Sequence, residues 1–258
     1  MRRLKAALEE AFRPDKCPPW LATIGIHEIS SLTGKSDPYA SIRQEEMAAA
    51  EQVFRRIRPR YGDDFRSCIE LAVLGNNLDF FRNIGDLETA LAEEWSGRID
   101  FSIDHLDRIG EKLSGLNRGS VVFLADNAGE VFFDIPLLNK IGAMGVRALY
   151  GVKERPFLND LTWADLERTG MLSQIPCTLS TGTGALLDLS SLATAFREEL
   201  ENCDLIISKG QANYECLSEL SLEKDIFYLL KAKCQPIRKT LNVPLNSYVA
   251  LLSEISGR

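Results

Sequence analysis

The stretch VVFLADNAGE, residues 121–130, decides the fold. It begins with apolar residues 121–125, an uninterrupted run that is typical of a strand buried on both faces of a parallel sheet. The run stops at Asp126 and Asn127, and apolar residues then recur every three or four positions up to residue 141, which predicts a helix. Short polar side chains at the carboxyl end of a parallel strand are where α/β proteins place binding sites. A carboxylate beside an amide suits a hard cation, which prefers oxygen ligands.

Strand and helix patterns alternate from this stretch to the end of the chain. The predicted strands are residues 121–125, 146–152, 177–181, 204–208 and 226–230. The predicted helices between them are residues 131–144, 163–169, 185–202 and 212–220. Strands that alternate with helices need crossover connections and therefore form a mostly parallel sheet. Residues 248–252 predict one more strand, at an edge of that sheet.

The part before residue 118 has a different pattern, in which apolar positions recur almost everywhere at helical spacing. The predicted helices there are residues 22–32, 42–57, 65–81, 87–95 and 103–116. Proline and glycine turn signals separate them. We therefore predict an all-helical N-terminal domain over residues 1–117, followed by a Rossmann-like three-layer α/β/α domain with a mostly parallel sheet over residues 118–258.

Composition narrows the class of protein. A net charge of -7 without a basic block argues against a nucleic-acid surface. No secretory signal starts the sequence, and no apolar run reaches the roughly 20 residues of a membrane helix. We therefore expect a cytoplasmic protein without membrane or nucleic-acid partners.

The six cysteines are scattered without a CxxC pair, which favours free thiols over disulfides. His27 and His105 lie far apart, which excludes a histidine-rich zinc site, and the oligomeric state stays open.

Polar residues follow each of the first four predicted strands. Because the carboxyl ends of parallel strands meet at one edge of a sheet, we expect acids, amides, a Thr/Gly turn and lysines to line one crevice. That set suits a phosphate beside a divalent metal, since carboxylates bind the cation while lysines and free backbone donors bind the anion. The residues are, strand by strand, Asp126, Asn127 and Glu130; Lys153, Asn159 and Asp160; Thr181, Gly182, Thr183 and Gly184; and Lys209, Gly210 and Asn213.

Each motif also has a simpler interpretation. Asp126 and Asn127 could cap the following helix, and Asp160 could cap the helix that begins near Trp163. The Thr/Gly segment could be a plain turn, and Lys209 could be solvated. Dinucleotide or S-adenosylmethionine binding is disfavoured because no GxGxxG turn follows the first strand, and a Walker A loop is absent. The haloacid-dehalogenase pattern DxDx[TV] lacks its second acid here.

Several blocks together resemble the damage-control phosphatases, a metal-dependent family long known only as a domain of unknown function. The most specific are DNAGE at residues 126–130, ND at 159–160 and KGQANYE at 209–215. Further matches are DPY at 37–39, GNNLDF at 75–80 and LLKAKC at 229–234. The blocks keep the family's order over nearly the whole chain. Three positions depart from it: Cys17-Pro18-Pro19-Trp20 stands where a CxxC is frequent, Arg43 where we expect lysine, and Phe81 where glycine is usual.

The resemblance implies hydrolysis of phosphate monoesters of small, sugar-like or damaged metabolites. It implies a divalent ion (Mn, Co, Ni or Mg) held by Asp126, Asn127 and Asp160, with Lys209 bound to the phosphate as the fourth catalytic residue. A water is the expected attacking group, and Glu130 serves either as base or in orienting the ligands. The expected substrate-binding residues are Asn76, Asp79, Glu130, Lys153, Thr183, Gly210 and Asn213. The alternative is a non-catalytic protein that binds a metal and a phosphometabolite.

Overall fold

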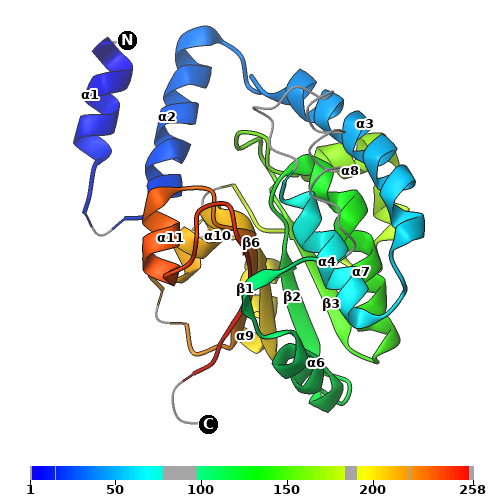
Figure 1. The fold of residues 1–258 in the computed structure, drawn as a ribbon. Coiled ribbons are helices and arrows are strands. Elements are labelled where there is room, and N and C mark those ends of the chain that lie inside the picture. Colours follow the sequence, from blue (N-terminus) through cyan, green and yellow to red (C-terminus); the bar gives the residue numbers. More distant parts are fainter. Residues whose placement is uncertain (1, 15, 78–97, 184–190, 221, 256–258) are drawn as a thin grey trace.

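The computed structural model describes residues 2–14, 16–77, 98–183, 191–220 and 222–255. Its centre is a seven-stranded sheet in the order β1-β7-β6-β5-β2-β3-β4 (Figure 1). Neighbouring strands are parallel except β6 and β7, which are antiparallel. The strands are β1 (Phe101–Asp104), β2 (Ser120–Leu124), β3 (Arg147–Val152), β4 (Thr178–Ser180), β5 (Leu205–Lys209), β6 (Ile226–Lys231) and β7 (Tyr248–Ser253).

Helices cover both faces of this sheet (Figure 1). Within the described ranges, none of them is long and apolar enough to span a membrane. They are α1 (Arg2–Ala11), α2 (Pro18–Thr33), α3 (Ala40–Ile57), α4 (Phe65–Gly75), α6 (Leu106–Gly115), α7 (Val131–Ala143), α8 (Trp163–Thr169), α9 (Thr194–Asn202), α10 (Gly210–Leu217) and α11 (Gln235–Leu241). Three short 3₁₀ helices are η1 (Arg58–Arg60), η2 (Ala128–Glu130) and η3 (Met171–Gln174).

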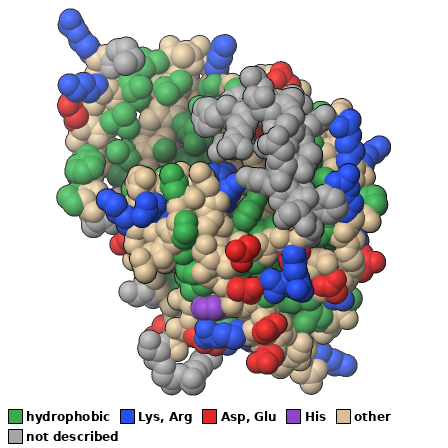
Figure 2. All heavy atoms as spheres, viewed as in Figure 1, with side chains coloured by type: hydrophobic (Ala, Val, Ile, Leu, Met, Phe, Trp, Pro, Cys, Tyr) green, Lys and Arg blue, Asp and Glu red, His purple; other side chains and the backbone are tan. Residues whose placement is uncertain are grey.

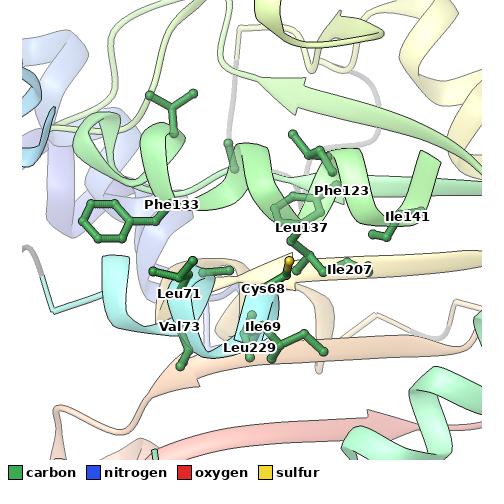
Figure 3. Packing of buried hydrophobic residues seen from close by; sticks show 14 of the residues in the cluster. Cys68, Ile69, Leu71, Val73, Phe123, Phe133, Leu137, Ile141, Ile207 and Leu229 are labelled. Atoms are coloured by element: carbon green, nitrogen blue, oxygen red, sulfur yellow. The ribbon is translucent and has the colours of Figure 1, made fainter. Parts of the chain in front are cut away.

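The alternation of side chains along β2 explains the three layers. Val121 and Phe123 pack into a cluster with α3, α4, α6, α7 and α8. Val122 and Leu124 point to the opposite face and pack with α9, α10 and α11. Figure 3 shows the first cluster, in which α7 and α4 lie against the strands. Since both faces of β2 are buried, every residue of the run is apolar, and burying each such side chain contributes about 1.5–3 kcal/mol.

The predicted fold class is confirmed: N-terminal helices precede a mostly parallel sheet with helices between its strands. The position of the last strand was predicted wrongly. β7 does not lie at an edge, because β1 pairs with it on one side and β6 on the other. Its alternating apolar residues predict a strand but do not indicate which neighbours it has. The helix predicted at residues 87–95 lies outside the described residues, as does the first part, 185–190, of the helix predicted over residues 185–202. The described part of that second prediction forms α9, which begins at Thr194.

Two elements of the N-terminal part differ from the prediction. A helix was predicted over residues 103–116, but residues 101–104 form the strand β1. Helix α6 begins only at Leu106. Helix α4 ends at Gly75 rather than continuing to residue 81, and Asn76 begins a turn. Helices α3 and α4 share one hydrophobic cluster with the sheet. The division into two domains at residue 117 stays a prediction.

Helices α1 and α2 lie on the side of α10 and α11 (Figure 1). No residue of α1 is buried. Hydrophobic side chains gather over α1 and α2 in Figure 2. Leu4, Leu8, Phe12 and Leu21 are among the residues that line a hollow between these two helices. The contact of α2 with α10 attaches this pair of helices to the helix that follows β5.

Candidate active site

The polar residues predicted at the strand ends meet near the centre of the sheet. β2 pairs with β3 on one side and with β5 on the other, so the strand order reverses beside β2. In open α/β sheets such a reversal creates the crevice that binds ligands. Asp126 and Asn127 follow β2, and a bridge joins Asn127 to Asp160, beyond β3. The Leu161 amide donates to the Asp126 carbonyl at 2.9 Å. The structure therefore brings the three predicted metal-binding residues together.

The capping interpretations of these residues are wrong. Asn127 precedes η2, but its side chain makes no capping hydrogen bond there. Helix α8 is capped by Thr162 and not by Asp160: the Thr162 hydroxyl accepts from the Asp165 amide at 3.1 Å, and the Asp165 carboxylate accepts in return from the Thr162 amide. Other residues thus satisfy the helix ends, which leaves the strand-end acids for another purpose.

The carboxyl groups of Asp126 and Asp160 lie in a site that is almost closed to water. Their exposed fractions are 8% and 9%. Burial, followed by the charges of Glu130 and Asp160, raises the pKa of Asp126 well above its ordinary value. Burial raises the pKa of Asp160 to about 6, although Lys153 opposes this shift from 3.9 Å away. Burial and the neighbouring acids therefore disfavour the charged forms of both carboxyls, and a bound cation would favour those charged forms.

The chemistry of the donors fits a hard divalent cation. Asn127 Nδ2 donates to Asp126 Oδ2 at 3.3 Å and to Glu130 Oε1 at 2.9 Å, so its amide oxygen faces away from these carboxylates. In the parts of the chain described, no group of three His, Cys, Asp or Glu side chains could hold a metal ion. An ion held by Asp126, Asn127 and Asp160 would have two carboxylates and one amide, a set that suits Mg²⁺ or Mn²⁺ with water completing the shell.

Lys209 lies in a buried ion-pair cluster rather than in an open crevice. Its Nζ donates to Glu130 Oε2 at 2.7 Å and to Asp134 Oδ1 at 2.6 Å, and all three side chains are 0% exposed. Burial lowers the pKa of Lys209, but Asp134 and Glu130 outweigh burial and raise it above its ordinary value. Burial raises the pKa of Glu130, but Lys209 outweighs burial and lowers it. This geometry differs from the predicted phosphate contact, because the ammonium donates to protein carboxylates.

Asn76 and Asn213 join the segments that form the site. Asn76 Nδ2 donates to Glu130 Oε1 at 2.9 Å, while its Oδ1 accepts from the Lys231 amide at 3.1 Å. These bonds join the end of α4 to the segment after β2 and to the end of β6. Asn213 Nδ2 donates at 2.9 Å both to the Ala125 carbonyl after β2 and to the last carbonyl of β5. Contact with a substrate stays a prediction for both residues.

Gly210 brings the backbone after β5 against the carboxylate of Asp126. It has a φ of +75°, in the left-handed region that favours glycine. A Cβ atom at this position would overlap the carboxylate of Asp126. Gly210 was predicted to bind substrate, and the structure gives it a further reason to be glycine.

The remaining predicted substrate residues have different surroundings. Lys153 is 8% exposed, and its ammonium lies 5.8 Å from the centre of the Phe157 ring and beside Asp160. Thr183 is exposed, and its backbone amide donates to the Ser191 carbonyl at 3.4 Å. Asp79 lies within residues 78–97, outside the described residues.

Three residues that support the site were not predicted from the sequence. Asp134 holds Lys209, and the Tyr150 hydroxyl donates to Asp134 at 2.8 Å. An acid and a phenol within otherwise apolar segments were the available signal. Glu46 of α3 accepts from the Gly129 amide at 3.3 Å and from Asn159 Nδ2 at 3.1 Å. It lies 83 and 113 positions from these partners, so sequence spacing could not indicate the contact.

The three-layer fold, with acidic residues grouped where the strand order reverses, defines the chain as an α/β protein of the open-sheet class. The chain belongs to the damage-control phosphatase ARMT1-like domain family, whose model matches residues 1–249. It is 32% identical over 239 residues to a damage-control phosphatase of Archaeoglobus fulgidus. That alignment covers 91% of this chain and 82% of the relative. It is 30% identical over 247 residues to the damage-control phosphatase PH1575 of Pyrococcus horikoshii. That alignment covers 95% of this chain and 84% of the relative.

A solved structure has the same fold. The crystal structure of PH1575, a DUF89 family protein from Pyrococcus horikoshii, superimposes with a TM-score of 0.85 at 28% identity. The match covers 97% of this chain and 87% of that chain. The family resemblance of the signature blocks is therefore confirmed over nearly the whole length of the chain.

Proposed function

We propose that this protein is a metal-dependent phosphatase that hydrolyses phosphate monoesters of small metabolites. The observation that carries the proposal is the group of Asp126, Asn127 and Asp160 at the reversal of strand order, in which both carboxyls are buried and have raised pKa values. The names of the relatives from Archaeoglobus and Pyrococcus support the reaction class. The narrower substrate class, sugar-like or damaged phosphometabolites, follows from the family resemblance.

The three oxygen donors would hold a divalent ion (Mn, Co, Ni or Mg), which offsets their charge and draws electron density from the phosphoryl oxygens. Glu130 accepts from Asn76, Asn127 and Lys209 and has a lowered pKa, which makes it a weak base. We therefore assign it to orienting the two amides. Lys153 is the cation that we assign to the phosphate, because its ammonium lies 3.9 Å from Asp160 Oδ2.

Asp126→Asn tests the metal-dependent reaction. The amide keeps an oxygen that can accept from Asn76 but removes a carboxylate from the donor set. We expect hydrolysis of p-nitrophenyl phosphate to fall by roughly 100-fold or more, the scale of losing one electrostatic contact to a transition state. The free energy of unfolding should stay equal or rise, because a buried charge is removed.

The assay uses chelator-treated protein supplied with each metal in turn, and wild-type protein without metal is the control. Hydrolysis by Asp126→Asn at the wild-type rate would contradict the metal assignment. The non-catalytic alternative is favoured if calorimetry shows that the wild type binds metal but the protein hydrolyses no sugar phosphate, nucleotide or aryl phosphate.

A further inference from the structure

Two cysteines that are far apart in sequence lie in contact in the fold. Cys17 directly precedes α2, and Cys216 lies in α10, 199 positions later. Their Sγ atoms are 2.9 Å apart, compared with roughly 2.05 Å in a disulfide, so a small side-chain movement would join them. Both cysteines are free and buried, with exposed fractions of 4% and 2%.

The two thiols differ in reactivity. Cys17 is the N-cap of the sixteen-residue helix α2, where the partial positive charge of the helix end favours a thiolate. The hydrogen bond with Cys216 lowers the pKa of Cys17, and the Trp20 amide acts in the same direction. The same hydrogen bond, together with burial, raises the pKa of Cys216. Its place at the helix end, with the lowered pKa, makes Cys17 the better nucleophile, and either thiol can donate in the hydrogen bond that the two share.

A cavity gives a small reagent access to Cys17. It has a volume of about 340 Å³, and Lys16, Cys17, Tyr214 and Glu215 are among its lining residues. Cys216 is not among the lining residues, so a reagent that enters this cavity meets Cys17 first.

We propose that Cys17 and Cys216 are a redox-active pair that a small disulfide of the glutathione class converts to an intramolecular disulfide. The Cys17 thiolate attacks one sulfur of the small disulfide, forms a mixed disulfide and releases one thiolate. Cys216 then loses its proton, attacks Cys17 Sγ and releases the second thiolate. The two cysteines lose two electrons and two protons, and the small disulfide becomes two thiols.

The disulfide would tie the start of α2 to α10. Trp20 and Cys17 pack in the same hydrophobic cluster as Tyr214 and Cys216, so the bond would reinforce an existing contact. Helix α10 begins at Gly210, which lies against Asp126. The cross-link would therefore attach the amino-terminal helices covalently to an element of the active site.

Peptide mapping of the folded full-length chain tests the proposal. The protein is incubated in glutathione buffers of increasing oxidised fraction, blocked with an alkylating reagent and digested with trypsin without reduction. Cleavage after lysine and arginine yields peptides 17–35 and 210–224, each with one cysteine. We expect these two peptides to appear linked, and the melting temperature to be higher in the oxidised sample. Absence of this linked pair in oxidising buffer, or cross-links to other cysteines in its place, would overturn the proposal.

Single variants test the order of attack. In Cys216→Ala, glutathione should remain on Cys17 as a stable mixed disulfide, whereas Cys17→Ala should leave Cys216 unmodified. The two variants are compared by the rate at which glutathione attaches to the remaining cysteine. If Cys216 in the Cys17→Ala variant reacts as fast as Cys17 in the Cys216→Ala variant, the assigned order is wrong. Cys177→Ala, a partly exposed cysteine outside the pair, is the matched control and should still form the linked peptides. If a variant does not fold, the wild-type peptide map alone decides whether the pair forms.

Discussion

Lys209, Glu130, Asp134 and Tyr150 are all 0% exposed, so each needs its partners inside the protein. One ammonium serves two carboxylates, and the Tyr150 hydroxyl supplies Asp134 with another donor. Burial raises the pKa of Asp134 to about 6 even though Lys209 opposes the shift. The single positive charge is therefore essential to this cluster, and its removal would leave two buried anions uncompensated.

Lys209→Met tests this role by keeping most of the side-chain volume while removing the charge. We expect the free energy of unfolding to fall by about 3–5 kcal/mol, the usual result of breaking a buried ion pair. Adding Asp134→Asn removes one of the orphaned charges, so the double-mutant cycle should show a coupling energy of about 0.5–3 kcal/mol. Urea unfolding measures both values. Lys239→Met, an exposed lysine on α11, is the control, and additive losses in the cycle would contradict the assigned role.

The residues of the site were predictable from sequence only in part. Asp126, Asn127 and Asp160 end or follow strands with strong apolar patterns, and parallel topology brings such positions together. The direction of the Lys209 side chain was not predictable in this way. It depends on Asp134, an acid in the helix that follows β2, and sequence alone does not show that this helix places a carboxylate opposite β5.

At the scale of single elements, the turn from β5 into α10 is the tightest part of the site. Lys209 ends the strand and Gly210 begins the helix, with no connecting loop between them. The left-handed φ of Gly210 and its approach to Asp126 together exclude a side chain at this point. Asn213, in the first turn of α10, then joins this turn to the end of β2.

Gly210→Ala should displace the Asp126 carboxylate. We expect metal-dependent phosphatase activity to fall by roughly 100-fold, the scale of losing one electrostatic contact to a transition state. Gly145→Ala is a matched control, because Gly145 has a φ of +82° but open space where the Cβ would lie. Both variants should lose about 1–2 kcal/mol of stability from backbone strain. Activity is measured over a range of metal concentrations, and equal activity of the two variants would show that the Asp126 contact is unimportant.

Short elements explain most of the errors in the predicted fold. β1 has only four residues and directly precedes α6, so the helical spacing of the following residues masks it. β1 also takes the edge position beside β7, which made the predicted place of the last strand wrong. The long central strands were predicted correctly, because burial on both faces gives them continuous apolar sequences.

At the scale of the whole molecule, α3 contacts the loops after β2 and β3, which carry the residues proposed to bind the metal. Arg43 Nε donates to Asp165 at 2.8 Å, and its Nη1 donates to the Leu158 carbonyl at 3.3 Å. One turn later, Glu46 accepts from the loops after β2 and β3. A helix from the part predicted as a separate domain thus positions both loops of the site.

Glu46→Ala should loosen both loops without removing a metal-binding residue. We expect the metal concentration for half-maximal activity to rise by about 10–100-fold, the usual effect of losing a residue that orients metal ligands. Saturating metal should restore most of the maximal rate, because Asp126, Asn127 and Asp160 are intact. Glu45→Ala is the control, since Glu45 is exposed on the same helix and should change neither value. A lower melting temperature with an unchanged metal requirement would mean that α3 stabilises the fold but does not position the metal-binding loops.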